Sequence, residues 1–377
     1  MSQSLLDTAA GGGLGVETRS EAATSAARDL RSFIQQLAHS GRLISVEETV
    51  DWRFEIGKRT RASHRPLLFE RVKDYPGQRV FTNGLCNWSS IGMALGLDPE
   101  TPSQVLIAET RTRLGKPIPP RMVSVPSFLN NELTGSDLDL TRFAVPQWSE
   151  LDAGRYIGTW HVNISQDPET HSRNIGVYRM QILSPTQATI SASPKSGLML
   201  HFAKAESLGR ALPTIVAIGV PEAVVIAGGA ACPAGMDEFD LAGALGQEPV
   251  ELALSEPTGL EFPARSEIVI EGFIRPGIRV QDGPYFDYCG VPNTNPQAVL
   301  FEASRIMFRS NPIFRGSAIG TPGAEDHQLF AFLAQLELVD FHGSRAKQKI
   351  QNVLWKHGQF RALQWVGRFG GLLRKVR

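Results

Sequence analysis

The sequence predicts an α+β protein whose strands form an antiparallel or barrel-like sheet. Residues 155–320 contain short apolar, β-branched segments separated by Gly/Pro turns, a pattern typical of such sheets. The 36 glycines and 24 prolines also favour a β-containing architecture over a helical bundle. Helices are expected at residues 29–41, 201–210 and 237–245.

The first element follows a small, polar, Gly-rich stretch, residues 1–27, which we expect to be a disordered tail. The helix over residues 29–41 has apolar residues at helical spacing, namely Leu30, Phe33, Ile34 and Leu37. Gly41 is expected to end this helix. The segments "RPLLFERV" and "QRVFTNG" then predict two strands joined by the turn "DYPG".

The middle of the chain predicts most of the strands. In chain order they are "GTWHVNIS", "NIGVYRMQIL", "ATISAS", "PTIVAIGV", "EAVVIAGG", "EIVIEGFI" and "AVLFEASRIMF". Proline-punctuated loops between residues 101 and 150 indicate a crossing between domains. We therefore expect an N-terminal α/β domain at 28–115, a β domain at 116–325 and a C-terminal segment at 326–377.

The C-terminal segment begins with a predicted helix, "AEDHQLFAFLAQLELVDF", and becomes strongly basic. After Asp340 there are nine Lys and Arg residues and no acidic residue, with Trp355 and Trp365 among them. Such an amphipathic end can dock on its own protein or on a partner subunit, which is the interpretation we favour. Peripheral membrane contact and nucleic-acid binding are the weaker alternatives.

Charge and cysteine usage limit the class of protein. Lys+Arg and Asp+Glu both number 38, so the net charge indicates no nucleic acid or other polyanionic partner. Cys86, Cys232 and Cys289 lie far apart, which is typical of a reducing compartment. We find neither a secretory signal nor a run of membrane-spanning length, and expect a cytoplasmic protein.

One expected core strand, "NIGVYRMQI", carries an arginine near its middle. Because a guanidinium does not lose its charge, Arg179 must either reach water or meet an anion. Asp282 and Asp287 flank a Gly-Pro turn in "QDGPYFDYCG", which can bring both carboxylates to one cavity. Two such carboxylates push their pKa values apart and leave one as a general acid. The alternative is an ordinary inter-strand ion pair between Arg179 and one aspartate.

Asn174 and Glu238 offer oxygen ligands that suit Mg²⁺ or Mn²⁺. The alternative for Glu238 is a solvated surface residue. In a regular strand Asn174 and Arg179 would point to opposite faces, so both can face one site only if the strand is broken by a bulge or a bound ligand.

Four ordered motifs resemble the UbiD-type decarboxylases, which use prenylated flavin mononucleotide. "NIGVYRMQ" is similar to that family's N-x-G-x-Y-R-x-Q motif, and "DEFDLAG" to its S-E-Y-x-x-A-G segment. "SEIVIEGFI" resembles its E-I-V-x-E-G strand, and "QDGPYFDYCG" its acidic turn. The opening "DLRSFIQQLAHSGRLISV" and the strand pair after it are also similar, so the resemblance covers about residues 28–340.

The resemblance implies a central FMN-binding split β-barrel, with a divalent ion, Mn²⁺ or Mg²⁺, and K⁺ nearby. It places the metal ligands at Asn174 and Glu238. The residues it implies around the prenylated FMN are Asn174, Val177, Tyr178, Arg179, Ser191, Ala192, Ser193, Lys195, Ser196, Gly197 and Glu238.

The family's catalytic Glu-Arg-Glu/Asp set corresponds to Asp282, Arg179 and Asp287. The resemblance implies non-oxidative, reversible decarboxylation of an aromatic or α,β-unsaturated acid, with the modified flavin as electron sink. Arg179 would orient the substrate carboxylate and Asp287 would return a proton to carbon, while Asp282 tunes both. A flavin prenyltransferase would supply the cofactor, and a homo-oligomer or a second subunit is implied.

The chain departs from the family pattern at several positions. Asp282 stands where Glu is usual, Phe286 replaces a turn glycine, and Lys195 stands where a His is common. The basic C-terminal segment replaces most of the expected C-terminal domain. Two other functions therefore stay open: a weakly catalytic or non-catalytic flavin-binding subunit or assembly factor, and an FMN-binding split-barrel oxidoreductase.

Overall fold

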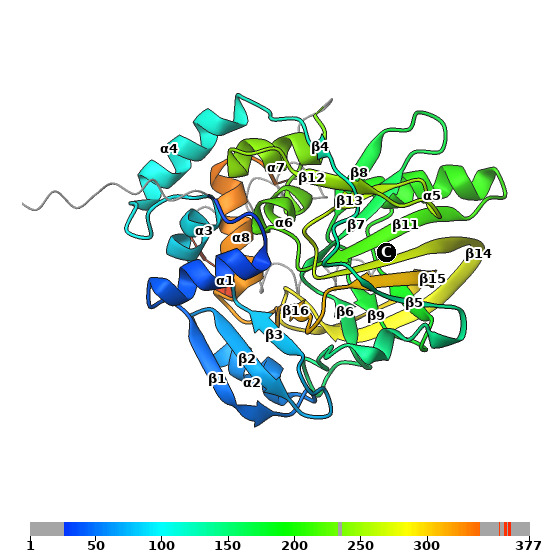
Figure 1. Cartoon of the computed structure of the whole chain (residues 1–377), viewed down its shortest axis with the longest axis horizontal. Coiled ribbons are helices and arrows are strands. Elements are labelled where there is room, and N and C mark those ends of the chain that lie inside the picture. The colour runs from blue at the N-terminus through cyan, green and yellow to red at the C-terminus, as the bar shows by residue number, and fades with distance from the viewer. Residues whose placement is uncertain (1–25, 233–235, 340–353, 355–357, 360, 363–377) are drawn as a thin grey trace, which may run out of the picture.

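The computed structural model describes residues 26–232 and 236–339, together with residues 354, 358, 359, 361 and 362. Figure 1 shows a small N-terminal sheet on one side of the molecule and a larger curled sheet on the other, with helices packed beside and between them. This mixed α+β architecture is the one expected from the sequence.

The N-terminal unit is built on a four-stranded sheet in the order β1–β2–β3–β16. Its strands are β1 (Ile44–Val50), β2 (Leu67–Val72), β3 (Arg79–Thr82) and β16 (Ile313–Arg315). β2 and β3 are antiparallel, and Asp74 and Gly77 in the turn between them have φ values of 67° and 77°. The predicted strand pair is confirmed. β16 pairs in parallel with β3, so the chain returns to this sheet after building the curled one.

The helices of this half are α1 (Leu30–His39), α2 (Glu55–Ala62), α3 (Trp88–Ala94) and α4 (Ser103–Leu114). α1 forms where its apolar spacing predicts it, and all four of those apolar residues are buried. Asp29 caps it: its carboxylate accepts from the Ser32 N–H at 2.8 Å, and the Asp29 N–H donates back to Ser32 Oγ at 3.1 Å. Gly41, with φ of 67°, follows its C-terminal end.

The curled sheet follows the order β10–β15–β14–β11–β7–β8, with β5 added beside β15, and every pairing in it is antiparallel. Its strands are β5 (Asn131–Thr134), β7 (His161–Gln166), β8 (Arg173–Gly176), β10 (Gln187–Ile190), β11 (Leu212–Ile218), β14 (Ile268–Phe286) and β15 (Pro292–Phe308). Two isolated bridges, Arg179↔Ser191 and Ile182↔Ala188, continue the pairing on the side of β10 that faces away from β15. The sheet therefore curls into a half-barrel.

Smaller elements complete the molecule. A two-stranded pair joins β6 (Tyr156–Gly158) to β9 (Met180–Gln181), and a three-stranded sheet joins β13 (Glu261–Pro263), β12 (Glu251–Leu254) and β4 (Arg121–Met122). The remaining helices are α5 (Gly197–Ser207), α6 (Glu222–Gly229), α7 (Glu238–Gly246) and α8 (Glu325–Gln335), with short 3₁₀ turns at Gly135–Asp137 and Leu140–Arg142.

Three details differ from the sequence prediction. "EAVVIAGG" is not a strand but helix α6, because it is buried on every face and so carries no helical periodicity for sequence reasoning to detect. "NIGVYRMQIL" is not one strand: β8 ends at Gly176 and β9 begins at Met180. The helix expected at 201–210 is α5, which starts four residues earlier, at Gly197, after its N-cap Ser196.

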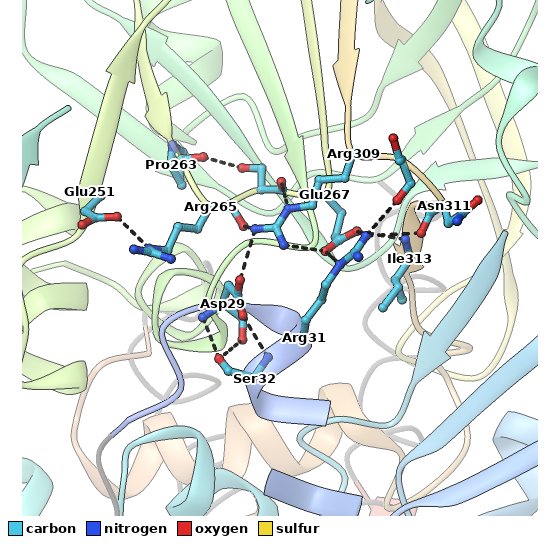
Figure 2. A network of polar contacts seen from close by, with 12 residues as sticks. Asp29, Arg31, Ser32, Glu251, Pro263, Arg265, Glu267, Arg309, Asn311 and Ile313 are labelled. Atoms are coloured by element: carbon cyan, nitrogen blue, oxygen red, sulfur yellow. Dashed lines mark hydrogen bonds and ion pairs between the residues drawn. The ribbon is translucent and has the colours of Figure 1, made fainter. Parts of the chain in front are cut away.

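A buried carboxylate, Glu267, joins the N-terminal helix to the curled sheet (Figure 2). Its two oxygens accept from Arg31 Nε at 2.7 Å and Arg31 Nη2 at 2.8 Å. Arg309 Nη1 lies 3.4 Å from the same carboxylate and Arg309 Nη2 donates to Asp29 Oδ2 at 3.1 Å. The Ile313 N–H donates to Glu267 at 3.1 Å. The N-terminal end of α1, the residue before β14 and the start of β16 are thus joined by one network of polar contacts around Glu267, which we call the hub.

Within the ranges that the structure describes, no helix is both long and apolar enough to cross a membrane. The predicted helix at the start of the C-terminal segment is confirmed as α8. The predictions for residues 1–25 and for nearly all of the basic stretch after residue 340 fall outside the described residues.

Candidate active site

The acidic turn, residues 282–287 at the end of β14, lies against Arg179. Arg179 Nε and Nη2 contact Asp282 Oδ1 at 2.6 Å and 2.5 Å. The other carboxylate oxygen of Asp282 accepts from Thr189 Oγ1 at 2.7 Å. Asp282 is fully buried and the Arg179 side chain is 14% exposed, so the arginine in the middle of the expected strand is compensated inside the protein.

Asp287 lies in the same turn but is held differently. Its two oxygens accept from the Cys289 N–H at 2.9 Å and from Asn293 Nδ2 at 3.0 Å. Arg179 Nη2 donates to the Asn293 carbonyl at 3.3 Å, so Asn293 bridges the guanidinium and Asp287. Among the described residues Asp287 forms no direct ion pair with Arg179. One carboxylate meets the guanidinium directly, and the second reaches it through Asn293.

Burial sets the protonation of both acids. It raises the pKa of Asp282, although the Arg179 guanidinium and the Thr189 hydroxyl oppose the change. Burial also raises the pKa of Asp287, against the hydrogen bonds from Asn293 and Cys289. Asp287 therefore sits where a carboxyl group can hold a proton and where its carboxylate is also hydrogen-bonded once the proton has left.

The break between β8 and β9 brings a second set of residues together. Asn174 Nδ2 donates to Tyr178 Oη at 3.4 Å. The Tyr178 ring folds back over Gly176, where an added Cβ would lie 2.3 Å from the ring. Tyr178 also interacts with the Ser196 side chain at the start of α5. Gly197 allows α5 to approach Asn174 closely, because a Cβ at this position would lie only 1.9 Å from Asn174 Oδ1.

Glu238 opens α7 beside the same residues. Its carboxylate interacts with the Ile175 N–H, next to Asn174, and electrostatically with Tyr178. Burial, reinforced by the neighbouring Asp237, raises the pKa of Glu238 to about 7. Glu238 is half-buried, and the Arg173 charge opposes the rise only in part, so its carboxylate can accept a cation. No cluster of three or more His, Cys, Asp or Glu side chains suited to a metal occurs in the described part of the chain.

The other residues that the sequence analysis placed around the flavin lie between the Arg179–Asp282–Asp287 set and the Asn174–Glu238 set. Ser191 pairs with Arg179 in an isolated bridge, and its hydroxyl accepts from Asn295 Nδ2 at 3.0 Å. Ser193 Oγ accepts from the Lys195 N–H at 3.4 Å, and the exposed Lys195 side chain has no ion-pair partner among the described residues. Two further residues of this group, Val177 and Ala192, are half-buried.

The Phe286 ring lies beside Arg61, whose guanidinium carbon is 5.4 Å from the ring centroid. Phe286 is not among the residues with positive φ, so the backbone there accommodates a side chain without strain.

Sequence reasoning missed several residues of this site. Thr189 and Asn293 hold Asp282 and Asp287, and Asp152 accepts from the Phe286 N–H at 2.8 Å. Gln181 accepts from the Gly283 N–H at 2.9 Å. Gln181 belongs to the "NIGVYRMQ" motif, which was a usable signal, whereas nothing in the sequence around Asp152 marks it.

Two family models match the chain. The N-terminal domain of 3-octaprenyl-4-hydroxybenzoate carboxy-lyase matches residues 34–109, and the Rift-related domain of that enzyme family, UbiD, matches residues 121–322.

Curated relatives are similar along most of the chain. A phenolic acid decarboxylase of Escherichia coli O157:H7 is 26% identical over 361 residues, which cover 92% of this chain and 76% of that protein. A pyrrole-2-carboxylic acid decarboxylase of Pseudomonas aeruginosa is 31% identical over 329 residues, covering 83% of this chain and 66% of that protein.

Solved structures of the same class have the same fold. An evolved dimeric form of the UbiD-class enzyme HmfF from Pelotomaculum thermopropionicum, in complex with prFMN, is 30% identical with a TM-score of 0.75, covering 82% of this chain and 71% of that one. The vanillic acid decarboxylase of Sedimentibacter hydroxybenzoicus is 29% identical with a TM-score of 0.78, covering 81% and 67%. The chain belongs to the UbiD family of carboxy-lyases.

Proposed function

We propose that the protein decarboxylates an aromatic or α,β-unsaturated carboxylic acid, reversibly and without net oxidation, using prenylated FMN. The observation that carries this proposal is the pairing of the largely buried Arg179 side chain with Asp282, beside a second, buried acid, Asp287. The relatives described above are decarboxylases of aromatic acids, and one related structure holds prFMN.

Each member of this set has a separate role. Arg179 binds the substrate carboxylate and fixes its direction, since a guanidinium suits a carboxylate geometrically. When bound, the prenylated flavin accepts the electron pair that the departing CO₂ leaves behind. Asp287 gives its proton to the carbon that lost CO₂, and the Cys289 N–H and Asn293 amide then hold its carboxylate. Asp282 keeps Arg179 in place.

The Asn174–Glu238 set would hold the cofactor phosphate through Mn²⁺ or Mg²⁺, with K⁺ as a further candidate ion. The half-buried Glu238 and the adjacent Asn174 and Tyr178 oxygens are hard ligands that suit such ions. Lys195 lies in the same segment and adds a positive charge toward the phosphate. Ser191, Ala192, Ser193, Ser196, Gly197 and Val177 would line the flavin.

A flavin prenyltransferase would supply the cofactor, and a second copy or another subunit is a proposed partner. One related structure is an evolved dimeric form, and another contains the chain ShVdcD. A cytoplasmic location stays a prediction from the cysteine usage.

The test is to co-express the protein with a flavin prenyltransferase and measure the mass and absorption spectrum of the flavin that copurifies. CO₂ release is then measured with cinnamic, hydroxybenzoic, pyrrole-carboxylic and dienoic acids. We expect bound prenylated FMN and turnover of at least one acid, and none with unmodified FMN. Bound prenylated FMN without turnover would favour the flavin-binding subunit. Unmodified FMN with hydride transfer would favour the oxidoreductase.

A further inference from the structure

The acidic turn is held at two backbone amides by residues outside it. The Gly283 N–H donates to Gln181 Oε1 at 2.9 Å, and the Phe286 N–H donates to Asp152 Oδ1 at 2.8 Å. These two amides lie just after the first carboxylate of the turn and just before the second. Gly283 has φ of 95°, and a Cβ there would lie 2.6 Å from the Asn293 carbonyl, so the turn has little freedom to relax.

Asp152 is part of a brace, residues 147–153, which connects the turn to the N-terminal unit. The Ala153 N–H donates to the Pro284 carbonyl at 2.7 Å, giving the brace a second contact with the turn. On the other side Arg61 Nη1, from α2, donates to the Trp148 carbonyl at 2.8 Å. Gln147 Nε2 donates to the Asp152 carbonyl at 3.0 Å, which fixes the brace internally.

Burying the Asp152 carboxylate at this position has a cost in free energy. Asp152 is 5% exposed, and its Oδ2 has no hydrogen-bond partner among the described residues. Burial raises the pKa of Asp152 to about 6, and the hydrogen bond from the Phe286 N–H and the Arg61 charge oppose this rise only in part. Buried polar atoms are normally paired, and an unpaired one in a native fold requires an explanation. The oxygen that is paired contacts the backbone next to Asp287.

We propose that Asp152 is a positioning residue for the reaction: with Gln181 it fixes the acidic turn, and so fixes Asp287 relative to Arg179. This inference rests on the proposed function, because it assigns Asp287 the proton transfer. Asp152 itself touches none of the reacting atoms. Its effect passes through one backbone amide to the adjacent residue.

The expected consequence is a loss of turnover without a loss of binding. Substrate carboxylate and flavin would contact Arg179 and the segment 174–197, with which, in the described part of the chain, the Asp152 side chain forms no hydrogen bond; it interacts with Arg179 only through its charge. A displacement of about 1 Å in a proton donor lowers the rate by about 100-fold. Removing the Asp152 acceptor is therefore expected to lower kcat by about 10- to 100-fold while KM and flavin occupancy stay within about threefold.

The test uses the full-length holoenzyme with three variants. Asp152→Ala removes the acceptor, and Asp152→Asn keeps an oxygen in its place. Asp139→Ala is the matched control, because Asp139 also accepts from a backbone amide, the Thr141 N–H at 2.8 Å, far from the turn along the chain. The readouts are kcat, KM, bound flavin, and hydrogen–deuterium exchange of peptides that cover residues 280–291.

We expect Asp152→Ala to lose kcat and to accelerate exchange at residues 283–288 by about tenfold or more. Asp152→Asn should restore both, and Asp139→Ala should change neither. Unchanged exchange in Asp152→Ala would overturn the inference, and so would faster exchange with wild-type kcat. If the wild type decarboxylates no acid in the panel, the proposed function fails, and exchange alone then decides whether Asp152 holds the turn.

Discussion

Replacing Glu267 should destabilise the whole fold, because this carboxylate joins α1, β14 and β16. Glu267 is fully buried and binds Arg31 through two hydrogen bonds of 2.7 Å and 2.8 Å. It also faces Arg309, which is 8% exposed on its side chain, and accepts from the Ile313 N–H. Glu267→Ala removes all of these contacts at once.

The expected loss in free energy of unfolding depends on whether each partner of Glu267 finds another partner or water in the variant. Removing one member of a buried ion pair costs about 3–5 kcal/mol when the other charge stays buried. In the variant the 33%-exposed Arg31 side chain can be hydrated, and Arg309 retains its ion pair with Asp29. The cost of leaving these charges without Glu267 is therefore expected near the lower end of that range. The orphaned Ile313 N–H adds about 1 kcal/mol or more. We expect Glu267→Ala to lower the free energy of unfolding by about 4 kcal/mol, a large part of a typical total of about 5–15 kcal/mol.

Urea unfolding followed by circular dichroism measures this loss. Glu302→Gln is the matched control, since Glu302 pairs with Arg275, which is 51% exposed, and should cost less than about 1 kcal/mol. In a double-mutant cycle, Glu267→Ala and Arg31→Ala should couple by at least about 1 kcal/mol. A loss below about 1 kcal/mol in Glu267→Ala would refute the reasoning, because the hub would then be no stronger than a surface pair.

Three further predictions concern the candidate site. Arg179→Lys keeps the charge but not the paired contacts with Asp282, so kcat should fall by about 100-fold or more while the copurified flavin remains; unchanged kcat would contradict the role of Arg179. Wild-type protein should retain part of its flavin after chelation of divalent ions, because Lys195 would neutralise the phosphate in the proposed site, whereas Lys195→His should lose it; equal loss in both, read from flavin absorbance after desalting, would defeat this prediction. Asp152 has a pKa of about 6 when folded and 3.8 ordinarily, so the folded state binds the proton more tightly and stability falls as pH rises from about 4 to about 6. Asp152→Asn should therefore be more stable than wild type above pH 6, by about 2–3 kcal/mol in urea unfolding, and equal to it near pH 4.

Local patterns were sufficient for part of the fold. Helix α1 was predictable because its buried side chains recur at helical spacing and are followed by Gly41, while its capping by Asp29 was seen only in the structure. The antiparallel curled sheet was predictable from alternating apolar segments with Gly/Pro turns. Helix α6 was not, because a segment buried on all sides has neither helical nor strand periodicity, and its β-branched residues favour a strand locally.

The candidate site was predictable only where one residue type raised a physical problem. Arg179 in an apolar segment required either water or an anion, and Asp282 supplies the anion. The parity of Asn174 and Arg179 indicated that a break was needed for both to face one site, but its form between Gly176 and Met180 was not predictable, since it includes the contacts of Tyr178 with Ser196 and Asn174. Asp152 looks like any loop aspartate, and its contact with Phe286 spans 134 positions of the chain.

The motifs that resemble the family differ in the physical purpose that the structure suggests for them. Glu267, in "SEIVIEGFI", lies at the junction with α1 and is expected to act on stability (Figure 2), whereas Arg179 and Asp282 belong to the candidate site. A match to the first kind of motif indicates that the chain folds as the family does, and only the second kind bears on chemistry. The two kinds separate experimentally, because Glu267→Ala should lower the free energy of unfolding and Arg179→Lys should lower kcat. If each of these two variants lowered both the free energy of unfolding and kcat, the hub and the candidate site would act as one unit and the separation would be wrong.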